Sequence, residues 1–266
     1  MASDSGLSCH ELPSNIFFQK HMKLLDVKLS CNLQNIALDE AVLERAERGE
    51  CTDELMRFWE PMKPIVVIGR SSPIEMEVDL DFCRQNDIAV VRRASGGQSV
   101  VNGPGCLIYS VLISYEKRPE LRMLDNAHEF VMGRMRSAID SLGVEVQMEG
   151  TCDLTLAHLD GSRRKVSGNA LRCRQNWMLY HGTMLCDADL ELISNCLGRP
   201  KRMPDYRKER THSDFLAQLP VNIGDLQNAI TSTWQIKQST TDWPEKLTDE
   251  LVRHKYQNDE WNYKVR

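Results

Sequence analysis

The chain has 266 residues, of which 41% are hydrophobic and 27% charged, with a net charge of -5 and a pI near 5.8. This size and composition predict a soluble globular protein with a core of its own, in one large domain or two small ones. The acidic balance argues against nonspecific binding to nucleic acid or to an anionic membrane, so we expect neither as a partner.

The N-terminal segment, residues 1–13, has acidic and polar residues where a secretory signal needs a basic start and an apolar run. The longest apolar run near a possible span, residues 65–68, is too short to cross a bilayer. The nine cysteines are an odd number, and no two lie closer than ten residues, so the close pairs typical of zinc sites do not occur. We therefore expect a cytoplasmic protein whose thiols mostly pack as small hydrophobes.

The predicted elements begin after a flexible N-terminal arm, residues 1–20. Apolar residues recur at helical spacing over residues 33–46, and Gly49 suits the C-terminal cap of that helix. Two short apolar runs, residues 64–69 and 88–91, are typical of buried strands. The first half of the chain therefore combines one amphipathic helix with at least two strands.

A second amphipathic helix is predicted over residues 126–142, with a capping box that starts at Asn126 and an end at Gly143. The turn signal Asp160-Gly161 indicates a hairpin within a run of strands. Those strands are predicted at residues 144–147, 154–159, 165–170 and 177–186, and helices follow at 225–234 and 243–254 around a polar Gln-Ser-Thr-Thr linker. Helices around a hairpin-rich middle predict an α+β fold with an antiparallel or mixed sheet.

Two predicted strands are each followed by a loop suited to anions. Arg70 follows the first strand, in Gly69-Arg70-Ser71-Ser72, and arginine is well shaped for bidentate binding of phosphate or carboxylate. The second loop, residues 92–98, has paired glycines that let backbone amides approach a ligand, beside two arginines that can counter a phosphate. An ordinary solvated turn is the competing interpretation of each loop.

A third polar segment lies around Lys165. Its neighbours Ser167, Gly168 and Asn169 are small and leave room for a ligand beside the ammonium group, which could stabilise the charge that develops when an acyl carbonyl is attacked. His181 lies on the next predicted strand, where a hydrogen-bonded core histidine and a site residue are both compatible with the pattern. Together these segments predict a place to hold an anionic, activated acyl group.

Taken together, the segments resemble the lipoate-protein ligase family, part of the wider group of biotin and lipoate protein ligases. The matching pieces follow the family's order and approximate spacing across residues 25–260. They are residues 34–40, 64–70, 92–97, 153–154, 164–170 and 181–185.

The resemblance implies an α+β fold with a mixed, largely antiparallel sheet flanked by helices, related to class II aminoacyl-tRNA synthetases and biotin ligases. It implies that ATP and magnesium activate lipoate or octanoate as an acyl adenylate, which a lysine of a carrier domain then attacks. The carriers would be lipoyl domains of 2-oxoacid dehydrogenase E2 subunits or the glycine cleavage H protein.

The same resemblance assigns roles to residues of this chain. Lys165 matches the lysine that contacts the acyl carbonyl and the phosphate, and Asp153 would help to position magnesium or the adenylate. The implied substrate and adenylate pocket consists of Arg70, Arg93, Ser95, Gly96, Gly97, Gln98, Asp153, Ser167, Gly168, His181, Gly182 and Thr183.

Several positions depart from the ligase pattern. Ligases usually have a third glycine at Gln98, a His-Asp pair at Asn102-Gly103 and an asparagine at Cys152, whereas Gln98 and residues 103–105 look like octanoyltransferases. The cysteine nucleophile of those transferases falls in a region that holds Met178 here. Cys152 could still accept an acyl group as a thioester, which leaves an octanoyl or lipoyl transferase as an alternative. A non-catalytic lipoyl-binding module is a third hypothesis.

We expect residues 21–266 to form one catalytic domain. Residues 259–262 look like the segment at which the large domain of ligases ends and a small C-terminal accessory domain begins, so we expect this chain to lack that domain. Full adenylating activity would then either need a separate accessory subunit or be absent. Lipoate against octanoate, and ligase against transferase, stay open at this point.

Overall fold

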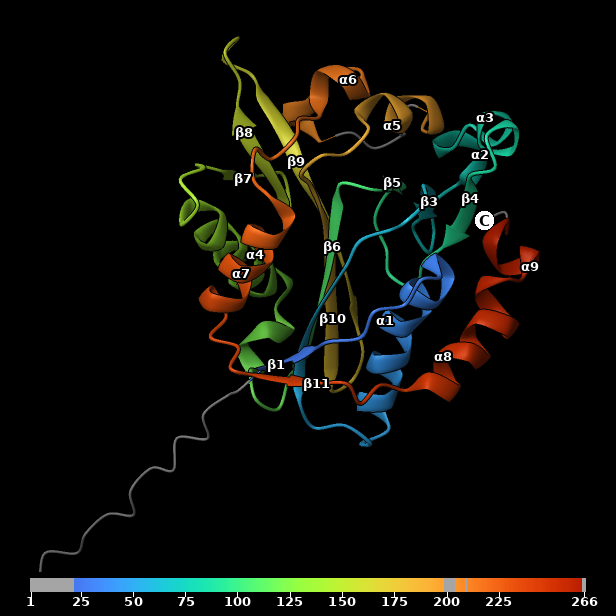
Figure 1. Ribbon diagram of the computed structural model, residues 1–266, viewed down its shortest axis with the longest axis vertical. Helices are drawn as coiled ribbons and strands as arrows, with labels where there is room; N and C mark the ends of the chain where they lie inside the picture. Colours follow the sequence, from blue (N-terminus) through green and yellow to red (C-terminus); the bar gives the residue numbers. More distant parts are fainter. Residues whose placement is uncertain (1–21, 199–203, 209, 265–266) are drawn as a thin grey trace, which may run out of the picture.

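The computed structural model describes residues 22–198, 204–208 and 210–264, and the arm predicted for residues 1–20 lies outside them. The described residues form two sheets with helices packed around them (Figure 1). The larger sheet has the spatial order β11 (Gln238–Thr240), β1 (Met22–Leu25), β2 (Glu54–Trp59), β6 (Cys106–Ser114), β10 (Trp177–Leu185), β9 (Arg163–Cys173), β8 (Asp153–Ala157) and β7 (Gln147–Glu149).

Most neighbours in this sheet are antiparallel. Strand β1 runs parallel to both β11 and β2, and each of the other pairs is antiparallel. The smaller sheet places β3 (Ile65–Ile68) between β4 (Ala89–Arg92), which is parallel to it, and β5 (Val100–Asn102), which is antiparallel. The predicted class, α+β with a mixed and largely antiparallel sheet flanked by helices, is confirmed.

The helices surround both sheets. In the described part of the chain they are α1 (Asn32–Glu47), α2 (Ile74–Glu77), α3 (Leu80–Gln85), α4 (Leu124–Asp140), α5 (Leu190–Cys196), α6 (His212–Phe215), α7 (Ile223–Thr233), α8 (Glu245–Leu251) and α9 (Asp259–Asn262), with 3-10 turns η1 (Pro119–Arg122) and η2 (Asp205–Arg207) and a π-helical turn η3 (Val252–Tyr256). Figure 1 shows α4 and α7 on one side of β6 and β10, with α1 and α8 on the other.

Strands β6 and β10 form the centre of the larger sheet and contribute to a different core on each face. Successive side chains of a strand point to opposite faces. Tyr109, Val111 and Met178 therefore pack into the apolar core that also contains buried residues of α4 and α7. Leu112 and Leu179 point the other way and pack with buried residues of α1.

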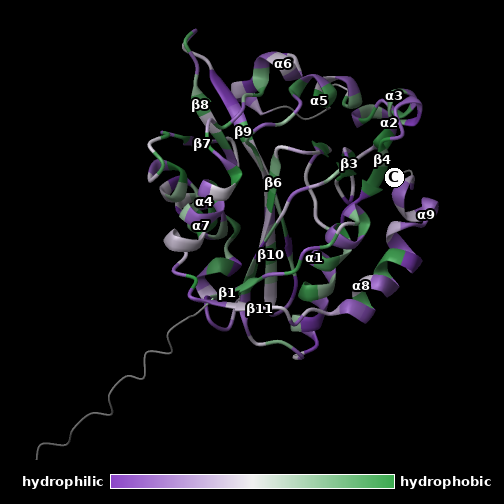
Figure 2. Ribbon diagram, viewed as in Figure 1, coloured by the Kyte–Doolittle hydropathy of each residue, from purple (hydrophilic) through white to green (hydrophobic). Residues whose placement is uncertain are grey.

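Hydropathy differs between the helix α8 and the strand β4. Figure 2 shows α8 coloured mostly as hydrophilic and β4 mostly as hydrophobic. Over residues 22–264, outside the gaps at 199–203 and 209, no helix has both the length and the apolar character needed to span a lipid bilayer.

Several predicted elements are confirmed. The first helix is α1, and Gly49 after it has a φ of +77°, a conformation that glycine adopts without strain. The hairpin at Asp160-Gly161 joins β8 to β9, where Ser162 N donates to Asp160 Oδ1 and Gly161 has a φ of +77°. The predicted strands at residues 64–69 and 88–91 correspond to β3 and β4.

Other predictions are wrong in ways that the packing explains. No capping box forms at Asn126: α4 begins at Leu124, and the Asn126 amide donates to the carbonyl of Glu120 in η1 instead. The polar linker at residues 238–241 contains β11, which is an edge strand of the larger sheet in the described structure. Its side chains are exposed or half-buried, so a polar sequence can form this strand. The strand predicted at residues 144–147 begins only at Gln147.

Candidate active site

A cavity of about 450 Å³ lies where α1, β9, β10 and the loop after β4 meet. This volume is within the range of ordinary small-molecule pockets. A smaller recess of about 90 Å³ shares part of its wall with the cavity. Lys165, Gly168 and Asp153 line both spaces, so the predicted segments converge on one place.

The two loops that the sequence analysis singled out are interlocked. The backbone N–H of Arg70 donates to the carbonyl of Ser95 at 2.8 Å, and Ser72 Oγ donates to the carbonyl of Gly97 at 3.0 Å. A Cβ atom at Gly69 would lie 1.7 Å from the Gly97 oxygen, so only glycine allows this approach. The loop after β3 therefore fixes the backbone of the loop that faces the cavity.

Arg93 is a buried brace of that loop. Its guanidinium donates from Nε to Ser95 Oγ at 2.9 Å, and from Nη2 to the carbonyls of Gly96 and Gln98. Nη1 donates to the carbonyl of Val67 at 3.1 Å. Burial lowers the pKa of Arg93 to about 10. The guanidinium thus holds its own loop in shape, and its donors are directed at protein oxygens.

The other two predicted arginines lie outside the cavity wall. Arg92 is buried, and its guanidinium donates to the carbonyls of Gly69 and Ser72 and to those of Trp261 and Asn262 in α9. It joins the C-terminal segment to the first loop. The side chain of Arg70 is exposed, and Arg70 lines neither the cavity nor the smaller recess.

The ammonium group of Lys165 lies at the cavity wall with 22% of the side chain exposed. Lys165 Nζ is 2.8 Å from Asp153 Oδ1, and Tyr206 donates its hydroxyl to Asp153 Oδ2 at 2.8 Å. A Cβ atom at Gly168 would lie 3.1 Å from Lys165 Nζ, so the absence of a side chain there makes room for the ammonium. The ammonium group of Lys165 therefore lies where the cavity and the smaller recess meet.

Asp153 was also predicted to hold magnesium. Both of its carboxylate oxygens already have partners, and the described residues include no group of three or more His, Cys, Asp or Glu side chains that could hold a metal ion. A single neutralised carboxylate does not make a protein cage for magnesium, which prefers six oxygen ligands. Magnesium at Asp153 stays a prediction, and no step below is routed through it.

The remaining predicted residues divide into two groups. Gln98, Gly182 and Thr183 line the cavity, and Thr183 Oγ1 donates to Asn102 Oδ1 at 3.0 Å. Gly96 and Ser167 are absent from the walls of both spaces. Ser167 is fully buried, and its hydroxyl accepts from Asn169 Nδ2 at 3.1 Å.

Asn169, which the sequence analysis named only as a small neighbour of Lys165, is a wall residue with its own hydrogen bonds. Its amide donates to the carbonyl of Cys152 at 2.6 Å, and its oxygen accepts from the hydroxyl of Tyr109. A Cβ atom at Gly182 would lie 1.8 Å from this oxygen, so Gly182 lets the amide lie flat against β10. The glycine in the sequence was the available signal for a close approach on the neighbouring strand.

Helix α1 contributes two buried carboxylates that received no role from the sequence. Glu40 accepts from the hydroxyl of Tyr256 at 2.8 Å and from Lys255 Nζ at 2.6 Å. Asp39 Oδ1 accepts from Arg57 Nη1 at 3.3 Å and from Ser110 Oγ at 2.9 Å. Both carboxylates line the cavity, and the signal available in the sequence was an adjacent acidic pair within an apolar-rich helix.

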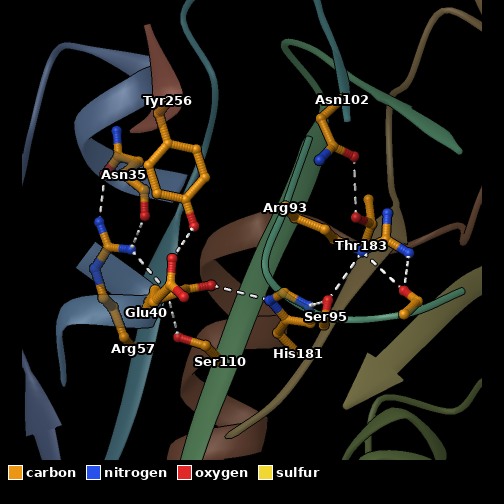
Figure 3. Close-up of polar contacts among 12 residues, drawn as sticks. Asn35, Glu40, Arg57, Arg93, Ser95, Asn102, Ser110, His181, Thr183 and Tyr256 are labelled. Carbon is orange, nitrogen blue, oxygen red and sulfur yellow. Dashed lines mark hydrogen bonds and ion pairs between the residues drawn. The ribbon is translucent and has the colours of Figure 1, made fainter. Parts of the chain in front are cut away.

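His181 connects α1 to the glycine loop. Its Nδ1 is 3.1 Å from Asp39 Oδ2, and its Nε2 is 2.6 Å from Ser95 Oγ. Figure 3 shows the His181 ring beside Ser95. Burial raises the pKa of the Asp39 carboxyl, but the hydrogen bond with His181 and the charge of Arg57 outweigh it, and the pKa lies below its ordinary value. Asp39 is therefore ionised at neutral pH, and an acid, an imidazole and a hydroxyl lie in line at the wall.

Cys152 lies at the cavity wall but is largely enclosed, with 9% of the residue exposed. Its thiol donates to the carbonyl of Asn169 at 3.5 Å. Burial, with a smaller contribution from the charge of Asp153, raises the pKa of Cys152 to about 11. A raised pKa disfavours the thiolate, which is the nucleophilic form of cysteine.

The chain is similar in sequence to lipoate-protein ligases and octanoyltransferases. The family model described as the lipoyl protein ligase A/B catalytic domain matches residues 32–240. A relative from Schizosaccharomyces pombe named "Putative lipoate-protein ligase A" is 33% identical over 62% of this chain, and the match covers 41% of that relative. The octanoyltransferase LipM of Geobacillus kaustophilus is 26% identical over 86% of this chain and 93% of its own length.

Solved structures share the fold. A chain from an archaeal lipoylation system, a bi-partite lipoate protein ligase and its E2 lipoyl domain from Thermoplasma acidophilum, superposes with a TM-score of 0.77 at 24% identity. The superposition covers 92% of this chain and 98% of that one. Because the family model matches most of this chain, the chain belongs to the lipoyl protein ligase A/B catalytic domain family.

Proposed function

We propose that this protein is a lipoate-protein ligase, which joins a lipoyl or octanoyl group to a lysine of a lipoyl domain through an acyl adenylate. The observation that carries the proposal is the position of Lys165, whose ammonium lies where a large and a small space meet. An acyl adenylate has an elongated tail and a nucleotide on either side of one carbonyl-phosphate junction. A cation at the junction of two spaces is suited to that shape.

The chemistry assigned to Lys165 is electrostatic. Attack of a carboxylate on the α-phosphate of ATP, and later attack of an amine on the acyl carbon, both place negative charge at the carbonyl-phosphate junction. An ammonium has three N–H donors, and Asp153 accepts one of them, which leaves donors for the carbonyl and phosphate oxygens. Interactions that strengthen as this charge develops raise turnover more than they tighten substrate binding.

The substrates and partners of the proposal follow from the family. ATP, lipoate or octanoate and the lipoyl domain of an E2 subunit would be the reactants. The Thermoplasma relative is a bi-partite ligase described with its E2 lipoyl domain, which supports a lipoyl domain as acceptor and an accessory subunit as partner. The glycine cleavage H protein as acceptor, a cytoplasmic location and the single catalytic domain at residues 21–266 stay predictions.

Octanoyl transfer is the second candidate, because a relative named octanoyltransferase LipM matches most of the chain and Cys152 lines the cavity. In that reaction the thiolate would take the acyl group from a carrier thioester and pass it to the acceptor lysine. The raised pKa and enclosure of Cys152 weigh against it. We therefore place ligation first.

The deciding experiment is mass analysis of a lipoyl domain after incubation with this protein, lipoate or octanoate, and ATP. Ligation predicts one added acyl group per domain only with ATP, together with release of pyrophosphate. Preformed acyl adenylate should replace the acid and ATP. An unmodified domain with the acid and ATP as well as with the preformed adenylate would contradict the proposal.

The cysteine variants separate the two candidates. Cys152→Ser should keep ATP-dependent modification, and so should the matched control Cys106→Ser, whose buried thiol also has a pKa of about 11 but does not line the cavity. A hydroxylamine-labile adduct with an octanoyl carrier donor, present in the Cys106→Ser variant and lost in Cys152→Ser, would establish transfer in place of ligation.

A further inference from the structure

We propose that Ser95, His181 and Asp39 form a proton relay that accepts the proton released when the acceptor lysine becomes acylated. The inference rests on the proposed function and adds a second set of residues to it. Ser95 is the group that meets the incoming amine, and His181 and Asp39 are positioning residues behind it. The three residues come from the loop after β4, from β10 and from α1, and all of them line the cavity.

The hydrogen bonds give the relay one direction. An ionised carboxylate only accepts, so the proton of the neutral imidazole lies on Nδ1, which is 3.1 Å from Asp39 Oδ2. His181 Nε2 is then an acceptor, and the hydroxyl 2.6 Å away at Ser95 donates to it. The ring is thus held in the tautomer that can take a proton from Ser95.

The hydroxyl oxygen of Ser95 is open to one more donor. It has two lone pairs, and Arg93 Nε occupies one of them at 2.9 Å. Among the described residues no other group donates to this oxygen, while its own hydrogen is directed at His181. An amine that enters the cavity can therefore donate to the second lone pair of Ser95.

The carboxylate behind the ring is prepared for a charged partner. Asp39 is ionised, and Oδ1 is occupied by Arg57 and Ser110, so Oδ2 is left directed at His181. When the ring gains a proton, the imidazolium faces a buried carboxylate and is stabilised by it. The arrangement of acid, imidazole and hydroxyl is that of a hydrolytic triad, used here to move a proton.

The step balances in atoms and electrons. The amine nitrogen forms a bond to the acyl carbon, the bond from that carbon to the phosphate oxygen breaks, and AMP leaves with the electron pair. The nitrogen loses one proton to Ser95 Oγ, and the original hydroxyl proton of Ser95 moves to His181 Nε2. The proton returns to solvent when the product leaves.

A nucleophilic role for Ser95 is less consistent with its surroundings. The Arg93 guanidinium donates to the oxygen that would have to attack, which lowers the electron density available for attack. The charged and titratable groups that line the cavity with His181, or pair with its lining residues, are Asp39 and Glu40 on α1, Arg57 on β2, Arg93 on the loop, Cys152 on the turn before β8, Asp153 on β8, Lys165 and Arg172 on β9, and Tyr256 on η3.

The test measures transfer from preformed acyl adenylate to a lipoyl domain. His181→Gln and Ser95→Ala should each lower the transfer rate by about 10²-fold or more, the usual contribution of a positioned base. The matched control is His128→Gln, which alters a buried histidine bonded to Tyr180 on the far face of the sheet and should transfer at the wild-type rate. Variant rates within twofold of an active wild type would overturn the relay.

Two readouts separate proton transfer from a merely structural role. In wild type the transfer rate should be lower in D2O than in H2O, because a proton moves during the step, and His181→Ala should lose part of this isotope effect. Added imidazole at fixed pH should restore transfer to His181→Ala, because the free base can take the proton in place of the missing ring. Absence of rescue together with an unchanged isotope effect would overturn the relay, and so would an acyl ester on Ser95 detected by mass analysis.

The outcome is distinguishable from failure of the proposed function. If the wild-type protein modifies no lipoyl domain from the adenylate, the proposed function itself fails. If the wild type is active and His181→Gln and Ser95→Ala transfer the acyl group at the wild-type rate, the ligase proposal stands and only the relay is lost.

Discussion

The two faces of β6 and β10 differ in what they bury. On the face toward α4 and α7, side chains such as Val111 and Met184 are apolar and belong to one large core. On the face toward α1, Ser110, His181 and Thr183 interrupt the apolar pattern, and buried charges from α1 and β2 approach them. One pair of strands thus supplies both the scaffold and the site.

The difference shows how the fold accommodates buried charge. An unpaired buried charge is costly, so each charged group on the cavity face has partners: Asp39 with Arg57, and Glu40 with Lys255 and Tyr256. The face toward α4 and α7 is mostly apolar, and its few polar groups, such as His128 and Tyr180, form hydrogen bonds without a network of ion pairs. Stability and chemistry should therefore respond separately to mutations on the two faces.

The strongest way to break this comparison is Arg57→Ala. It removes the cation that faces Asp39 and leaves a buried carboxylate without its charged partner, so the free energy of unfolding should fall by about 3–5 kcal/mol. Arg45→Ala is the control, because its ion pair with the exposed Asp242 is worth at most about 1 kcal/mol. Denaturant unfolding measures both, and equal losses would contradict the distinction between the sites.

Lys165→Ala tests the chemistry of the cavity face alone. Turnover should fall by about 10²–10³-fold, as when one stabilising donor of a developing charge is removed, while acid binding changes little. Lys23→Ala is matched to it, since Lys23 also has a carboxylate partner, Asp53 at 2.6 Å, but lies on β1 outside the cavity. Steady-state rates of lipoyl-domain modification check the prediction, and an unchanged rate removes the role of Lys165.

On the apolar face, Ile139→Val sharpens the comparison from the other side. It deletes one methylene from a fully buried residue of α4, which should lower the free energy of unfolding by about 0.5–1.5 kcal/mol. Because α4 touches the face away from the cavity, kcat and KM of the folded protein should stay unchanged. A large change in kcat would show that the two faces are coupled.

The smallest effect concerns acid pH. The pKa of Asp39 in the folded protein lies below the ordinary value of 3.8, so its ionisation contributes stability that is present above that value and is lost as the pH falls through the folded pKa. Asp39→Asn should therefore flatten the acid side of the stability curve. Unfolding midpoints between pH 5 and the acid limit measure it, and identical pH slopes for both proteins would be the contrary result.

Local patterns in the sequence predicted local structure well. Gly49 and Gly161 were expected at a helix end and a hairpin, and both have a positive φ. The apolar spacing of α1 was equally clear. Strand β6 was missed, because nine consecutive buried residues carry no alternation by which a strand can be told from a buried helix segment.

The site was predicted in part. Lys165, Gly168 and His181 were named from their neighbours in the sequence, and they line one cavity. Arg92 and Arg93 were expected to meet phosphate, yet their guanidinium groups donate to backbone carbonyls and, in Arg93, also to the Ser95 hydroxyl. A guanidinium in a glycine-rich loop has the same sequence signature whether it binds a ligand or braces the loop, because its partners lie elsewhere in the chain.

The sequence by itself determined the family, the class of fold and the segment that places Lys165 at the cavity, because glycine spacing and strand patterns lie within short segments. Tertiary structure decided which groups face each other: Asp39, Ser95 and His181 lie up to 142 positions apart in the chain and meet only when α1, the loop and β10 are packed together. It also decided that Cys152 is enclosed, since burial depends on neighbours that no local pattern records.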